Sequence, residues 1–153
     1  MIFSPKNLPP PVPAAAPGRS PSVRELALNI LNDAETRRLH VEDLLAATLR
    51  RHGDLSRADR ALLLELVQGT KRWELRLDYV LARLCHRPWG KVHPGVRQIL
   101  RLAAYQLLFL DRIPPHAAVA EAGNLARQRR LPASHLGFIN AVLRRLAEAG
   151  PPP

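Results

Sequence analysis

Two clusters of basic residues have the types and the spacing to bind phosphate groups. They are Lys71, Arg72 and Arg76 around Trp73, and Arg127, Arg129 and Arg130 further along the chain. An arginine fork holds a phosphate through two hydrogen bonds, and a tryptophan ring can stack on an unpaired base. A structural role stays open for both clusters, with the tryptophan covering the core and the later arginines favoured by a helix dipole. The chemistry that these residues could do is recognition of a nucleic acid.

The charge of the whole chain indicates the same class of partner. Its 153 residues carry a formal net charge of +10, and the isoelectric point is near 11.3. Clustered cations gain affinity for a polyanion by releasing the counterions that are condensed on its phosphates. Nearly all of the positive charge is arginine, which favours nucleic acid over the alternative of an acidic membrane surface.

The residue types that usually perform catalysis or hold a cofactor lack the spacing for it. The eight glycines are dispersed and form no phosphate-binding loop, and Cys85 is the single cysteine. No histidine has an acidic or cysteine ligand at a metal-site spacing, so each is interpreted as a solvated or capping residue. The histidines are His40, His52, His86, His93, His116 and His135. We therefore predict that the protein is not an enzyme and uses no cofactor or metal.

The basic clusters must be positioned by helices, because apolar residues recur at helical spacing along most of the chain. Ser22 and Ser56 each open a capping box, with Glu25 and Asp59 three residues later. Between these two helices, the stretch from Val41 to Arg51 predicts another. It is followed by Gly53, a residue able to take positive φ.

Prolines and glycine mark the later helices. Gly69 is expected to bend the long helical stretch that follows Ser56. Pro94 suits the first position of a helix so apolar that it should lie at the centre of the core. Pro114 and Pro115 start another helix, and Ser134 is expected to cap the last one. The predicted fold is an all-α, irregular bundle of about six to seven helices, without a sheet.

Composition divides the chain into three segments. Residues 1–21 are rich in Pro and Ala and are expected to form a flexible arm, which includes Arg19. Residues 22–149 are expected to form one helical domain, because they contain enough Leu, Ala, Val and Ile to bury a core. Residues 150–153 form a Pro-rich tail that cannot continue the last helix.

Several segments resemble the signature segments of the NusB family. They are SVRELALNIL, SRADRALLLELVQGTKRWELRLDYVL, ILRLAAYQLLFLDRIPPHAAVAEA and GFINAVLRRL, which together span most of residues 22–149. Within that family, the RADRAL and GTKRW segments are more similar to the N-terminal RNA-binding domain of the RsmB (Sun) type of ribosomal RNA 5-methylcytosine methyltransferase than to the free-standing antitermination factor. The resemblance implies a NusB-like bundle that binds RNA.

The resemblance also implies an RNA-binding face formed by the start of the first helix and the central helix. It carries over to Arg24 and Arg101 of this sequence, and Arg97 lies one turn before Arg101 on the same side. Arg19 is expected to order on RNA together with the arm. The alternative for each of these arginines is an ordinary solvated position.

The function that the resemblance implies is that of a non-catalytic RNA-binding protein in transcription antitermination or ribosomal RNA handling. Single-stranded RNA is the expected partner, either boxA-like or ribosomal, and a ribosomal protein is a further one. Two alternatives stay open: the RNA-binding domain of a truncated or split ribosomal RNA (cytosine-5) methyltransferase, and a protein-binding helical scaffold or homodimer. Cys85 stands in neither of the Pro-Cys and Thr-Cys contexts that the methyltransferase chemistry needs.

The start of the chain bears on the expected location. Residues 1–20 contain neither the pattern of a signal peptide nor an apolar run long enough to span a bilayer. The single cysteine fits a reducing compartment. The sequence therefore predicts a cytoplasmic protein that does not bind membranes.

Overall fold

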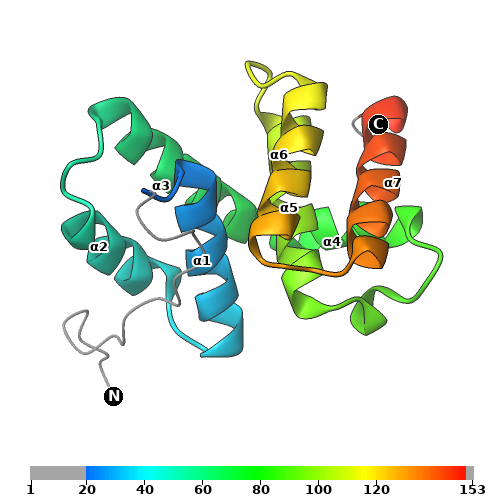
Figure 1. Ribbon diagram of the computed structural model, residues 1–153, viewed down its shortest axis with the longest axis horizontal. Coiled ribbons are helices and arrows are strands. Elements are labelled where there is room, and N and C mark those ends of the chain that lie inside the picture. The colour runs from blue at the N-terminus through cyan, green and yellow to red at the C-terminus, as the bar shows by residue number, and fades with distance from the viewer. Residues whose placement is uncertain (1–19, 151–153) are drawn as a thin grey trace. The chain divides into compact units, whose positions relative to one another are not determined.

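The computed structural model describes residues 20–150, and all regular structure in that range is helical (Figure 1). In chain order the elements are α1 (Val23–Thr36), α2 (Val41–Arg51), α3 (Arg57–Arg72), α4 (Glu74–Leu84), the 3-10 turn η2 (Trp89–Lys91), α5 (Pro94–Phe109), α6 (Pro115–Gln128) and α7 (Ala133–Ala149). The predicted all-α class is confirmed. Most of the predicted arm, with Arg19, and residues 151–153 of the tail lie outside the described residues.

Two serines begin helices as their sequence context predicts. The Ser22 hydroxyl accepts a hydrogen bond from the Glu25 amide at 3.2 Å. The Ser56 hydroxyl accepts one from the Asp59 amide at 3.1 Å. Each serine satisfies an amide that the first turn of the helix leaves without a backbone acceptor, which fixes the start of α1 and of α3.

Prolines begin two of the later helices, which is also confirmed. Pro94 occupies the first position of α5, and His93 caps that helix by accepting the Gly95 amide on Nδ1 at 3.0 Å. Pro115 is the first residue of α6, after Pro114. A proline is tolerated at this position because its missing amide hydrogen would have no intrahelical acceptor there.

Three local expectations were wrong. The long helical stretch is interrupted at Trp73, between α3 and α4, and not at Gly69, which lies inside α3. α7 begins after Pro132 without a side-chain cap, so Ser134 lies inside the helix. Gly53, after α2, does not have positive φ.

Positive φ occurs instead at two arginines that follow helices. Arg38 has φ 53° and Arg130 has φ 56°. After α6, the Leu131 amide donates to the Ala126 carbonyl at 3.0 Å and the Arg130 amide donates to the Arg127 carbonyl at 2.9 Å. This is the Schellman arrangement, in which glycine is the usual residue at the left-handed position.

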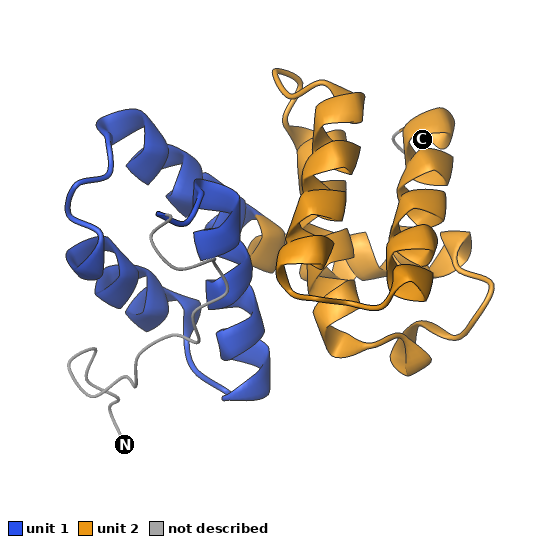
Figure 2. Cartoon of the chain, in the orientation of Figure 1, with its two compact units in different colours: residues 1–69 blue, residues 70–153 orange. Residues whose placement is uncertain are grey.

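Residues 1–69 and 70–153 form two compact units (Figure 2). In unit 1, α1 packs against α2. The buried apolar side chains of this unit include Leu28, Leu45 and Leu63, one from each of its helices. The 22–149 segment expected as one domain therefore contains two such units.

Unit 2 is organised around α5, as the apolar stripe of this helix predicts. α5 packs against α4, α6 and α7. Its side chains from Ile99 to Gln106 are all buried, so the helix is enclosed on every side. No helix of the described residues is long and apolar enough to cross a membrane.

Candidate nucleic-acid interface

An exposed basic surface of unit 2 lies at the end of α3 and along α4. Its members, called here the α4 basic face, are Lys71, Arg72, Arg76 and Arg83, and all four are exposed. Within residues 20–150 neither Arg72 nor Arg76 makes a hydrogen bond or an ion pair. These two guanidinium groups are therefore available to an external anion.

An aromatic ladder lies beside this face. Trp73, the residue between α3 and α4, is 42% exposed, and its ring stacks on Phe109 with centroids 5.0 Å apart. Phe109 stacks in turn on Tyr105 at 5.3 Å. The ladder fixes the orientation of the indole while leaving part of it in solvent. The structure thus combines the two roles considered for Trp73, covering apolar side chains and presenting a ring, but stacking on a base stays a prediction.

Sequence reasoning missed one part of this surface. Leu75 is 84% exposed and Tyr79 is 59% exposed, and they lie one turn apart on α4. The Arg83 guanidinium lies 5.5 Å from the centre of the Tyr79 ring and donates to its hydroxyl at 3.3 Å. The signal was present in the four-residue spacing of Leu75, Tyr79 and Arg83, which places them on one helix side opposite the buried Leu77 and Leu81.

Arg101 does not join the exposed face. Only 5% of the residue is exposed, and its Nε and Nη2 donate to the two carboxylate oxygens of Asp78 at 2.6 and 2.9 Å. Nη1 lies 3.6 Å from Glu74, and the guanidinium lies 5.9 Å from the centre of the Trp89 ring. The side chain predicted to contact RNA is therefore engaged within unit 2, where it joins α5 to α4. A direct RNA contact by Arg101 would require this arrangement to open.

Arg97 is also engaged internally. Its Nη1 donates to the Val92 carbonyl at 2.6 Å and to the Gly90 carbonyl at 3.5 Å. The residue is half-buried, and these bonds tie the first turn of α5 to η2. Its predicted reach to the RNA strand stays untested.

Arg24 lies in the first turn of α1 and is half-buried. It belongs to unit 1, whereas Arg101 belongs to unit 2. The face that was predicted to join them remains a prediction.

The third group of predicted site residues surrounds the end of α6. Arg127 is exposed and donates to the Asn124 side chain at 3.0 Å. Arg129 is half-buried, and Arg130 is exposed in its left-handed conformation. This group is a second basic site of unit 2, and its position at a helix C-terminus is favoured by the dipole with or without a ligand.

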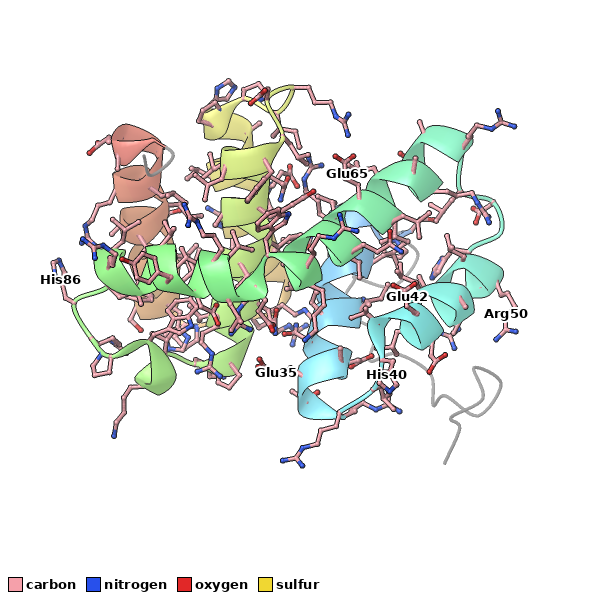
Figure 3. All side chains as sticks on the ribbon, turned by 180° about the vertical axis from the view of Figure 1, so that it is seen from behind. Glu35, His40, Glu42, Arg50, Glu65 and His86 are labelled. Carbon is pink, nitrogen blue, oxygen red and sulfur yellow. The ribbon has the colours of Figure 1, made fainter. Side chains whose placement is uncertain are left out.

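The histidines and the cysteine form no metal site among residues 20–150. His40 immediately precedes α2 and His86 follows α4, and both side chains, labelled in Figure 3, are exposed. His93 and His135 lie with ring centres 5.5 Å apart. Burial raises the pKa of the Cys85 thiol, although Arg145 and Arg87 act in the opposite direction. A thiol held protonated in this way is a poor nucleophile and a poor metal ligand.

Known proteins resemble this chain in sequence. The NusB family model matches residues 21–148. A probable ribosomal RNA small subunit methyltransferase B of Bacillus subtilis is 39% identical over 134 residues, which are 86% of this chain and 29% of that protein. The chain thus spans less than a third of the length of this methyltransferase. The transcription antitermination protein NusB of Desulforudis audaxviator is 37% identical over 82% of this chain and 90% of its own.

Solved structures show the same fold. NusB of T. maritima superposes with a TM-score of 0.77 at 25% identity, covering 88% of this chain and 95% of its own. A chain of the crystal structure of the antitermination factors NusB and NusE in complex with double-stranded RNA gives a TM-score of 0.74 at 18% identity, covering 83% of this chain and 94% of its own. The family model spans both units described above. The chain belongs to the NusB family.

Proposed function

We propose that this chain is a non-catalytic RNA-binding protein of the NusB type, which acts in transcription antitermination or ribosomal RNA handling. The observation that carries the proposal is the α4 basic face, where Arg72 and Arg76 are exposed without a partner in the described residues, beside the anchored ring of Trp73. Family membership supports the same function, because relatives include an antitermination protein.

The arrangement suits a single strand better than base-pair readout. Arginines that contact phosphates supply affinity that falls with salt, and they carry little sequence information. A partly exposed aromatic ring such as that of Trp73 adds stacking on unpaired bases. We infer that single-stranded RNA, boxA-like or ribosomal, binds along this face.

A binding titration with a boxA-like single-stranded RNA over a range of salt concentrations tests the proposal. The affinity should fall steeply with salt, and R72E together with R76E should weaken it by about tenfold or more. R50E is the matched control, because Arg50 is an exposed arginine of unit 1 at the end of α2 (Figure 3). Equal binding by all three proteins would reject the α4 basic face as the RNA site.

A second candidate function has its own observation. The 39% identity with the Bacillus subtilis methyltransferase covers 86% of this chain. This likeness favours the RNA-binding domain of a ribosomal RNA (cytosine-5) methyltransferase. Reading the coding sequence beyond Pro153 separates the two functions, and so does competition between boxA-like RNA and small-subunit ribosomal RNA fragments. Tighter binding of the ribosomal fragments would favour the methyltransferase domain.

A protein partner forms a further part of the proposal. Leu75 and Tyr79 are exposed on α4 and present apolar surface there. Phosphates and arginines would not cover this surface, whereas a partner protein would. A solved relative is bound to NusE, which supports a partner protein for the family fold. We propose a ribosomal protein as this partner. Sizing of the chain with and without such a protein tests it, and a stable homodimer abolished by L75E would favour self-association instead.

A further inference from the structure

Arg101 is a charged residue in a buried position, where arginine is rare. It is buried on a helix whose neighbouring side chains, from Ile99 to Gln106, are buried too. A guanidinium at such a site needs a carboxylate partner, because an unpaired buried charge is strongly unfavourable. Asp78 supplies that partner through two short hydrogen bonds.

The carboxylates that Arg101 binds come from the same helix as the basic face. Glu74 and Asp78 are the acidic residues of α4, and they lie one turn apart. Like charges at this spacing repel each other. Their side chains are 28% and 23% exposed, so both are still in contact with solvent.

One of the two carboxylates, Glu74, lies near two cations. Glu74 lies 3.3 Å from the ammonium of Lys71, a member of the α4 basic face, and 3.6 Å from Arg101. Without Arg101, Asp78 would lose its two hydrogen bonds and Glu74 would keep Lys71 as its neighbouring cation. The negative charge of α4 would then no longer be neutralised by α5. A cation that is paired with a carboxylate binds a phosphate less well, because the two anions compete for it.

The geometry points to Arg101 as a positioning residue of the RNA site. It acts through its carboxylate partners on α4 and not through a contact with RNA. Arg101 draws Asp78 and Glu74 toward α5 and neutralises their charge, so that the α4 basic face presents a positive field to phosphate. This role rests on the RNA-binding function proposed above. It assigns Arg101 no contact with RNA.

A double variant tests the role without leaving a buried charge. R101M with D78L replaces the ion pair by apolar side chains, an exchange that folded proteins often tolerate. Affinity for boxA-like single-stranded RNA should stay within about twofold of the wild type, with an unchanged slope of log affinity against log salt. R101M alone should bind about tenfold more weakly, because the charges of Asp78 and Glu74 are then not neutralised and repel the phosphates that approach α4.

R76M is the matched control for a direct contact. Loss of one phosphate contact on a single strand should reduce the salt slope by about 0.7. If the double variant shows that same reduction together with weak binding, Arg101 touches RNA and the positioning role is wrong. If R101M lowers the melting temperature but leaves affinity per folded molecule unchanged, the pair is only structural and the role is also wrong.

Failure of the proposed function looks different from failure of this role. A wild-type chain that does not bind the RNA at any salt concentration overturns both. A wild-type chain that binds, while R101M with D78L does not, overturns only the role of Arg101. Circular dichroism of each variant shows whether it has kept its helices. D78L alone measures the RNA affinity of a chain in which Arg101 has lost its carboxylate partner.

Discussion

Two pairs of arginines in unit 2 have the same chemistry and different surroundings. Arg72 and Arg76 are exposed and make no hydrogen bond or ion pair within the described residues, whereas Arg97 and Arg101 are bonded to carbonyls and carboxylates. A large positive charge therefore does not identify the binding surface by itself. Some arginines of this chain hold helices together, and others remain available to a ligand.

The largest expected effect is a difference in the free energy of unfolding between a variant of the buried Arg101 and a variant of the exposed Arg76. R101A should lower the free energy of unfolding by about 3 kcal/mol, because it leaves two carboxylates of α4 without their main cation. R76A should change it by less than about 0.5 kcal/mol, since an exposed arginine contributes little. Urea denaturation of both variants measures the difference. A loss below about 1 kcal/mol in R101A would contradict the assigned ion pair.

A second comparison uses two consecutive arginines of α7. Arg145 is half-buried and donates to the Leu84 carbonyl, the last residue of α4, at 2.6 Å, whereas Arg144 is exposed. Because a charged hydrogen bond to a part-buried acceptor is lost, R145A should cost about 2 kcal/mol. R144A should cost almost nothing. Equal melting temperatures for the two variants would show that the Leu84 carbonyl does not need Arg145.

Backbone conformation gives a third, smaller effect of opposite sign. Arg130 has φ 56°, which an L residue adopts at a cost that glycine avoids. R130G should therefore raise the free energy of unfolding by about 0.5 to 1 kcal/mol. R127G, at a position inside α6, is the control and should destabilise the protein. If R130G also weakens RNA binding, the strained arginine is kept for its side chain, which extends the interface to the end of α6.

The smallest expected effect concerns Cys85. Burial raises the pKa of its thiol, with Arg145 and then Arg87 opposing the shift. The folded thiol keeps its proton at a pH where the unfolded thiol has lost it, so stability falls as pH rises above the ordinary thiol pKa. Alkylation at about pH 8 should be slower in the folded chain than in urea, and R87M should slow it by a further factor of about two. Faster alkylation in the folded chain would contradict the stated cause.

Local rules of sequence predicted much of the fold. Ser22, Ser56, Pro94 and Pro115 begin helices for reasons contained in their own few residues, and the apolar stripe of α5 predicted its central place. The break at Trp73 was missed. The residues around Gly69 give no sign that the Trp73 ring stacks on Phe109. That contact joins residues far apart in the sequence.

The site was less predictable than the fold. The exposure of Arg72 and Arg76 follows from helical spacing, but the burial of Arg101 depends on Asp78, which lies 23 residues earlier. One signal was available: an arginine within a helix that is apolar on all sides requires a carboxylate from a neighbour. Spacing alone could not say which carboxylate.

The most direct test of the account follows the arginine side chains themselves during RNA binding. Nitrogen-15 spectra of the Nε–Hε groups should be recorded while a boxA-like single-stranded RNA is added to the chain. The account predicts that the Arg72 and Arg76 signals shift, while the Arg101 signal, bonded to Asp78, keeps its position. A shift of Arg101 with no change at Arg72 and Arg76 would contradict it.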